Sequence, residues 1–469
     1  MISLQLAKWM KNWRRARCAP SPLRGEGWGE GAPSSFGRTP LTLTLSPEGR
    51  GNRPSQPRPQ WLNATLRALA FVFVTTQAVH AQTPPPAPPQ PAPQAPQQRL
   101  TIGVVEIEND PRYEPIRAYE RLILKTREHP YAGAQVGVGE AQGFARVLRT
   151  DFALERITVK SPDAVASAVT EALASRNIQF FILDVPAEAF KPLAAAVRGK
   201  DVLLFNASAQ EDSLRREVCS REIVHVIPSQ AMYMDALTQL LASRKWRDVL
   251  ALQGPLPADV AMTKAFENSV KKFGLRLVAT REFKAGTDPR EREKNNPLLL
   301  TAGTRDFDVV FIADNGFEFA RQVPYQIVRA RPVIGSIDLE PVAWHWTWEH
   351  NGAPQINTRF NKATDGRRME GADWAAWMAV KMVVQATLRT RSNEFRKQRE
   401  FILGDTGFDG YKGLAVSVRK WDQQLRQAVF LATPFSVAAS APVEGFLHKT
   451  NTLDTLGDDE PETPCRVNR

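Results

Sequence analysis

Cysteine, histidine and tyrosine are scarce in this sequence: its 469 residues include 3 Cys, 6 His and 6 Tyr. No Cys/His spacing resembles a metal site. No phosphate-binding loop and no GxSxG nucleophile motif occurs. The run GVGEAQG at 137–143 lacks the preceding strand and the glycine spacing of a dinucleotide turn. These absences favour a protein without a metal or other cofactor, and one that is not an enzyme.

The three cysteines are far apart, at Cys18, Cys219 and Cys465. If the N-terminal region is cleaved, two remain. They either form one disulfide in an oxidising compartment or stay as two thiols, and the sequence leaves both readings open.

Positive charge is concentrated at the N-terminus. The net charge is +11, but residues 1–81 hold 11 Lys/Arg and 3 Asp/Glu, which leaves +3 for the rest of the chain. Nucleic-acid binding needs a concentrated basic face on the folded protein. The distribution therefore argues against a nucleic-acid partner.

Long hydrophobic runs are also missing. Residues 61–82 place Arg67 before a short apolar stretch at 68–76, and small residues follow at Val79 and Ala81. This layout is typical of a secretory signal peptide, and the apolar stretch is only about half the roughly 20 residues of a spanning helix. We expect cleavage after Ala81 and a periplasmic mature protein.

The segments on either side of this signal lack the periodicity of a folded domain. Residues 1–60 are rich in Gly, Pro, Ser and Arg, which suggests that the start codon is assigned too early; a basic cytoplasmic tail is the alternative. Residues 83–98, TPPPAPPQPAPQAPQQ, favour an extended polyproline spacer or an unimportant disordered leader. We treat 1–81 as leader plus signal peptide and 82–100 as a Pro-rich linker.

From Leu100 the pattern changes to alternating strands and helices. Apolar runs predict strands at 100–107, 152–159, 180–185, 202–205, 223–227, 248–252, 275–283, 308–313, 333–337, 415–420 and 428–432. Helical spacing predicts helices at 116–148 (interrupted by its glycines), 161–176, 187–198, 230–243, 258–273, 317–329 and 373–388. This alternation indicates an α/β fold with two doubly wound parallel-sheet lobes joined by a hinge.

Several stretches resemble the type I periplasmic binding fold, in the branch that contains the leucine/isoleucine/valine-binding proteins. They are LTIGVVEI, VLLFNASAQEDSLR, IVHVIPSQAMYMDALTQLL, FDVVFIADNGFEFARQ, PVIGSIDLEP and DWAAWMAVKMVVQA. The resemblance covers 101–435. It implies lobe 1 at 101–227 and 339–420, lobe 2 at 228–338 and 421–435, and a C-terminal tail at 436–469.

This resemblance implies the substrate-binding component of an ATP-binding-cassette (ABC) transporter, whose lobes close on a small-molecule solute. An ABC permease in the inner membrane is then a partner. DWAAWMAVK and GYKGLAVSVRKWDQQLRQAVFLAT resemble a subgroup associated with pyrroloquinoline-quinone-dependent alcohol dehydrogenase systems, which adds a quinoprotein dehydrogenase system as a partner. A ligand-sensing or accessory protein of that system, without transport, is the alternative.

The chain departs from the family at the loop after the third strand. Amino-acid-binding members hold the ligand carboxylate there with Ser, Thr and Gly, whereas this loop reads DVPAEAFKP and offers Asp184, which repels a carboxylate. A small neutral or cationic solute with hydroxyl groups fits this sequence better.

Ligands bind beyond the carboxyl ends of parallel strands. The candidate ligand-binding residues all follow predicted strands; for each, a helix cap or a turn is the competing reading. They are Glu106, Asn109, Asp184, Asn206, Ser208, Asp314, Asn315 and Asp338.

Trp344, Trp346 and Trp348 alternate along the chain, which predicts three rings on one face of an extended segment. They either line the cleft or contact a partner, or they pack an insertion onto lobe 1.

Overall fold

The computed structural model describes residues 98–113, 128–284, 286 and 288–467. The predicted signal peptide, leader and most of the Pro-rich linker lie outside these residues, as does 116–127 of the first predicted helix. None of the helices in the described part of the chain is both long and apolar enough to cross a membrane.

The fold is α/β, as predicted, with two parallel sheets. The first sheet has the order β2-β1-β3-β4-β5, from strands β1 (Gln98–Ile107), β2 (Thr150–Val159), β3 (Phe180–Asp184), β4 (Leu203–Asn206) and β5 (Ile223–His225). The second has the order β7-β6-β8-β9, from strands β6 (Asp248–Gln253), β7 (Arg276–Glu282), β8 (Val309–Ala313) and β9 (Val333–Gly335).

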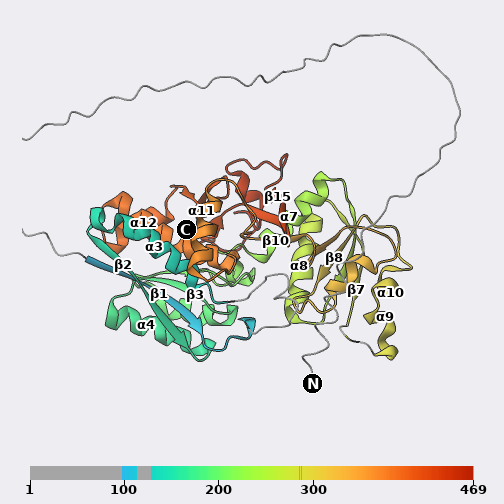
Figure 1. Cartoon of the computed structure of the whole chain (residues 1–469), viewed down its shortest axis with the longest axis horizontal. Coiled ribbons are helices and arrows are strands. Elements are labelled where there is room, and N and C mark those ends of the chain that lie inside the picture. Colours follow the sequence, from blue (N-terminus) through green and yellow to red (C-terminus); the bar gives the residue numbers. More distant parts are fainter. Residues whose placement is uncertain (1–97, 114–127, 285, 287, 468–469) are drawn as a thin grey trace, which may run out of the picture. The chain divides into compact units, whose positions relative to one another are not determined.

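Helices cover both faces of the first sheet. Successive side chains of each strand point to opposite faces, and the apolar side chains of both faces are buried under helices. In β1, Ile102 and Val104 join the cluster that includes α3 (Tyr131–Leu148) and α12 (Gly371–Thr390). Val105 and Ile107 join the cluster beneath α4 (Val165–Arg176) and α5 (Phe190–Val197). Figure 1 shows α4 on one side of β1–β3, with α3 and α12 on the other.

In the second sheet the inner strands β6 and β8 are mostly or wholly buried, whereas the edge strand β7 has no buried residue. The long helices of this sheet are α7 (Gln230–Ser243) and α8 (Pro257–Lys272), both close to prediction. Ser229 caps α7, where its hydroxyl accepts a hydrogen bond from Met232 N at 3.2 Å. Pro257 occupies the first turn of α8, where a missing N–H is harmless.

Two small antiparallel sheets and several short helices complete the described chain. The sheets join β10 (Glu340–Val342), β14 (Val429–Thr433) and β15 (Ser436–Ala441), and β11 (Phe408–Asp409), β12 (Ala415–Val418) and β13 (Leu425–Arg426). The other α-helices are α6 (Ser213–Arg216), α9 (Arg292–Asn295), α10 (Pro297–Thr301), α11 (Ala353–Ala363) and α13 (Phe395–Leu403).

Glutamine side chains tie the chain segment before β14 to the crossover that leaves β5. Gln424 Nε2 donates to His225 O at 2.9 Å and to Ile227 O at 3.0 Å. Gln427 Nε2 donates to Val226 O at 2.5 Å. The crossover between the two parallel sheets is therefore held through main-chain carbonyls. The lobe boundaries given above stay a prediction.

Three local expectations were wrong. The glycine-rich run does not interrupt α3, because Gly133 and Gly137 face α12: a Cβ on Gly133 would lie 2.0 Å from Asp373 O. In place of the helix predicted at 317–329 stands a short 3-10 helix, Ala320–Tyr325, which contains Pro324. A proline inside a helix removes a hydrogen bond and hinders continuation.

The third concerns the tryptophan row, which is not extended. Its backbone turns, with Trp348 N donating to His345 O at 3.0 Å. Trp344 is buried and donates to Asn357, and Trp348 donates to the Tyr411 carbonyl. The guanidinium of Arg368 stacks on Trp346, and its Cζ lies 3.5 Å from the centroid of the indole ring.

The C-terminal segment packs onto the rest of the protein. Asp454 is buried and accepts hydrogen bonds from Arg419 Nε and Arg426 Nε, both at 2.8 Å. Cys219 and Cys465 are bonded as a disulfide, which resolves the alternative left open by the sequence.

Candidate functional site

A cluster of charged side chains gathers at the carboxyl edge of the first sheet. Glu106 near the end of β1 and Asp184 at the end of β3 are register partners on neighbouring strands. Register partners point to the same face of a sheet, here the face covered by α3. Two buried carboxylates therefore stand side by side, and such a pair is tolerated only when cations and donors surround it.

Asp184 is the centre of the cluster and is fully buried. Its carboxylate lies 2.6 Å from His129 Nδ1 and accepts a hydrogen bond from the Tyr113 hydroxyl at 2.7 Å. Arg112 Nη2 approaches the same carboxylate at 3.3 Å. The partners come from the loop after β1 and from the residue just before the turn into α3, so Asp184 fastens both segments to the sheet edge.

Besides Asp184, Arg112 is held by two further neighbours, Asp110 and Ser208. Its Nε and Nη2 donate to the Asp110 carboxylate, at 2.9 and 2.6 Å. Its Nη1 donates to the Ser208 hydroxyl at 3.0 Å. Each guanidinium nitrogen thus already has an acceptor, and a planar fork held this way is pre-organised.

Glu106 has one satisfied and one unsatisfied oxygen. Oε1 accepts hydrogen bonds from Arg156 Nε at 2.6 Å and Thr158 Oγ1 at 3.3 Å. Oε2 is buried and accepts no hydrogen bond from any residue that the structure describes. Its basic neighbour His129 Nδ1 is 4.0 Å away. A buried acceptor without a donor is costly, so this oxygen is a candidate ligand contact.

The electrostatics of the cluster favour a charged His129–Asp184 pair. Burial alone would raise the pKa of Asp184, but the His129 hydrogen bond and the Arg112 charge outweigh it, and the pKa is lowered. Burial works against the charged form of His129 too, yet Asp184 and Glu106 raise its pKa above the ordinary value of 6.5. Burial, followed by the charge of Asp184, raises the pKa of Tyr113, so this hydroxyl stays a donor.

Three of the predicted site residues, Glu106, Asp184 and Ser208, meet in this cluster. Asn109 lies nearby in the chain but is exposed, at φ 55°, in the turn after β1. Asn206 is buried on the opposite face of the sheet, since it is the register partner of Leu183. Its carboxamide closes the following loop on Ala209 and faces His225, which gives it a structural role.

The predicted residues of the second sheet form a separate network. The Asp314 carboxylate accepts from Phe319 N and Ala320 N, so it caps the 3-10 helix. Asn315 donates from its backbone and its side chain to Asp259 Oδ1, at 2.7 and 2.8 Å. Burial raises the pKa of Asp314, against these hydrogen bonds.

Asp338 occupies a tight turn between β9 and β10, at φ 59°. It is half-buried, and burial together with the charge of Glu340 raises its pKa.

Sequence reasoning missed five charged or phenolic members of the cluster: Asp110, Arg112, Tyr113, His129 and Arg156. The first four follow β1 in a region read only as a loop and a helix, and Arg156 lies within a predicted strand. The DPRY run after a strand carries the one available signal, since an Asp two residues before an Arg suits a local ion pair. None of the described residues forms a group that suits a metal ion.

Comparisons with known proteins point to one fold. A family model described as "Periplasmic binding protein" matches residues 158–322. The chain is similar to a branched-chain amino acid ABC transporter periplasmic ligand-binding protein of Burkholderia xenovorans, with a TM-score of 0.57 and 13% identity over 73% of this chain and 95% of that one. No curated protein matches the sequence.

Two further structures were solved with ligands. The substrate-binding protein of a branched-chain amino acid transporter from Streptococcus pneumoniae, in complex with isoleucine, has a TM-score of 0.54 and 15% identity over 73% of this chain and 99% of that one. A solute-binding protein of an ABC transporter from R. palustris, in complex with benzoate, has a TM-score of 0.51 and 11% identity over 71% and 92%. Together with the two parallel sheets, these likenesses show that the chain has the type I periplasmic binding protein fold.

Proposed function

We propose that this protein is the periplasmic substrate-binding component of an ABC transporter, which binds a small solute by hinge closure of its two lobes. The observation that carries the proposal is the Asp184 cluster, at the sheet edge where ligands bind in parallel α/β sheets. The fold supports it, because structurally similar proteins are ABC transporter binding proteins. An ABC permease is the expected partner.

The cluster favours a solute that donates hydrogen bonds. The guanidinium nitrogens of Arg112 already have acceptors, so a carboxylate finds no vacant fork there. Glu106 Oε2, in contrast, is an acceptor that lacks a donor among the described residues. A hydroxyl or ammonium group supplies such a donor. We therefore propose a neutral or cationic, hydroxyl- or amine-bearing solute, delivered without chemical change.

The biological setting is a second part of the proposal. The resemblance of DWAAWMAVK and GYKGLAVSVRKWDQQLRQAVFLAT supports a link to a quinone-dependent alcohol oxidation system. An accessory or sensory role in that system, without a permease, is the alternative. Solute uptake into cells that lack this protein separates the two: uptake is lost in the first case and unchanged in the second.

A thermal-shift screen tests the binding role. The panel contains alcohols, aldehydes, polyamines, amino acids and quinone cofactors. A ligand present at 100 times its dissociation constant adds about 2.7 kcal/mol of apparent stability. We expect the largest shift from a hydroxyl- or amine-bearing compound, and none of the tested alcohols should be turned over.

Paired variants connect the shift to the site. Glu106→Gln replaces an acceptor oxygen of the buried carboxylate by a donor and should abolish the shift. Glu171→Gln, on the exposed face of α4, should leave it intact. A flat response to the whole panel contradicts the binding role, and a largest shift from branched-chain amino acids contradicts the proposed ligand class.

A further inference from the structure

A second concave surface lies at the opposite edge of the first sheet. It is a groove of about 1270 Å³, lined by eight Lys or Arg residues and four Asp or Glu residues. Gly199 and Lys200 lie just before β4, and Ser220 and Glu222 just before β5, so the groove is at the amino-terminal edge of these strands. The Asp184 cluster lies at the carboxyl edge, and none of its residues lines the groove.

Three arginines in the groove are fixed by main-chain carbonyls, and none of them forms an ion pair with a carboxylate of the described residues. Arg221 Nε donates to Val467 O at 3.1 Å, and Arg399 Nη2 donates to Arg221 O at 2.8 Å. Arg466 Nη1 donates to Cys465 O at 2.7 Å. Carbonyls orient a guanidinium without cancelling its charge. The groove therefore presents positive charge at defined positions, the arrangement that recognises carboxylates.

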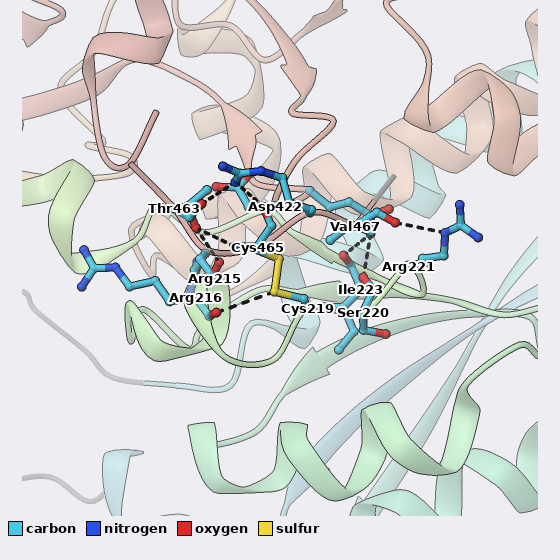
Figure 2. The surroundings of a disulfide bond; sticks show 12 residues. Arg215, Arg216, Cys219, Ser220, Arg221, Ile223, Asp422, Thr463, Cys465 and Val467 are labelled. Atoms are coloured by element: carbon cyan, nitrogen blue, oxygen red, sulfur yellow. Dashed lines mark hydrogen bonds between the residues drawn. A yellow bond between two sulfur atoms is a disulfide. The ribbon is translucent and has the colours of Figure 1, made fainter. Parts of the chain in front are cut away.

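The disulfide holds one wall of the groove in place. Cys219 and Cys465 are both close to the arginines, and Cys219, Arg466 and Val467 line the groove. Figure 2 shows the Cys219–Cys465 bond with Arg221 directed at Val467. The wall formed by the C-terminal segment is thus covalently fixed to the residues before β5.

Partial burial disfavours the charged form of one groove arginine. Arg399 is half-buried, and burial lowers the pKa of its guanidinium; Glu222 opposes this shift and Arg221 reinforces it. Glu222 is itself committed to Ser220 and to the backbone of Gly199. A cation that is partly dehydrated beside other cations is stabilised by an anion that enters the groove.

We propose that this groove is a docking site for an acidic peptide segment of a partner protein. Its volume exceeds that of a single small-molecule pocket, which spans about 300–1,000 Å³. Its concave form does not match a flat membrane. Phe395, its one aromatic lining residue, is buried, so the bases of a nucleic acid have no ring to stack on. The proposal is independent of solute binding at the other edge.

The test uses a fluorescent peptide of ten glutamates and the full chain, with binding followed by anisotropy. The groove variant combines Lys191→Glu, Arg198→Glu and Lys200→Glu, three exposed residues of the groove. The control combines Lys271→Glu, Arg292→Glu and Arg305→Glu, three exposed residues outside it. Both variants change the net charge by the same amount, so a difference between them reports the groove.

The expected result is a peptide affinity that falls by about tenfold or more in the groove variant and by less than about twofold in the control. Circular dichroism should show both variants folded, and their response to the solute panel should be unchanged. Equal losses in the two variants, or no peptide binding by the unmodified chain, overturn the proposal. Tighter binding of a ten-nucleotide single strand, of anionic lipid vesicles or of inorganic phosphate also overturns it.

Discussion

Asp184→Asn should destabilise the protein strongly and change the dependence of its stability on pH. The substitution keeps the shape of the side chain but removes the charge that holds His129, Arg112 and Tyr113. Removing one partner of a buried ion pair costs about 3–5 kcal/mol. Because the amide keeps one acceptor oxygen, we expect a loss of about 3 kcal/mol in the free energy of unfolding at pH 5.

The pH dependence follows from the two shifted pKa values. The raised pKa of His129 gives stability that is fully present below its unfolded value of 6.5 and is lost as pH rises through the folded value. The lowered pKa of Asp184 gives stability that is present above 3.8 and is lost as pH falls through the folded value. The contribution of the pair is therefore greatest between these two values.

Urea unfolding followed by tryptophan fluorescence, at a series of pH values from 3 to 9, measures both effects. In Asp184→Asn the decline of stability above pH 6.5 should flatten, since His129 loses the anion that raises its pKa. The control Asp201→Asn removes a carboxylate paired with Arg396 at an exposed position and should change stability by less than about 0.5 kcal/mol. A loss below about 1 kcal/mol at pH 5, or an unchanged pH profile, refutes the reasoning.

Three further substitutions test the packing around the site. Gly133→Ala should lower the free energy of unfolding by about 1–3 kcal/mol, because the added Cβ meets the backbone of α12. Gly139 has open space around it, so Gly139→Ala should stabilise the same helix by up to about 1 kcal/mol. Equal effects of the two substitutions in urea unfolding contradict this. Burial lowers the pKa of Lys412 well below 10.5, so the free energy of unfolding should rise as pH rises toward 10.5. Lys412→Met should remove this pH dependence and add about 1 kcal/mol to the free energy of unfolding at pH 7. A variant that is less stable than the unmodified chain at pH 7 argues against this. Replacing Cys219 and Cys465 by serine should cost about 2–5 kcal/mol, since the bond closes a loop with a sequence separation of 246 residues; a smaller loss in the same melts means that the C-terminal segment is held by its other contacts.

The sequence predicted the architecture well where a pattern was long. Helices α7 and α8 and the buried strands of both sheets follow from periodicity, because burial on one or both faces imposes it. The helix predicted at 317–329 does not form, because Pro324 interrupts it; the prediction followed the apolar spacing and did not take this proline into account. The glycines of α3 were wrongly read as an interruption of the helix. They allow α12 to pack closely, and this contact between two helices cannot be read from the sequence of one of them.

The site was only partly predictable. Strand ends gave Glu106 and Asp184, since the carboxyl edge of a parallel sheet is fixed by the fold. Arg112, Tyr113 and His129 lie 72, 71 and 55 residues from Asp184, and no periodicity connects them to it.

Asn206 lies apart from the cluster. It ends a strand, but alternation along β4 groups it with Leu204 and not with Phe205, so it faces the helices away from the cluster. The run LLFN is apolar up to Asn206 and does not show which face the side chain shares; the register of β4 with β3 decides it.

The two edges of the first sheet differ in charge: buried carboxylates lie at the carboxyl edge, and an excess of basic residues lies at the amino-terminal edge. At the carboxyl edge, three carboxylates are matched by Arg112, Arg156 and His129, and one buried oxygen of Glu106 is left as an acceptor. We propose that such a site selects a hydrogen-bond donor and discriminates against anions. At the amino-terminal edge, arginines are held by carbonyls, which supports the proposed binding of an acidic segment in the groove. In these two proposals the solute and the acidic partner bind at opposite edges of the first sheet, so they do not compete for one site.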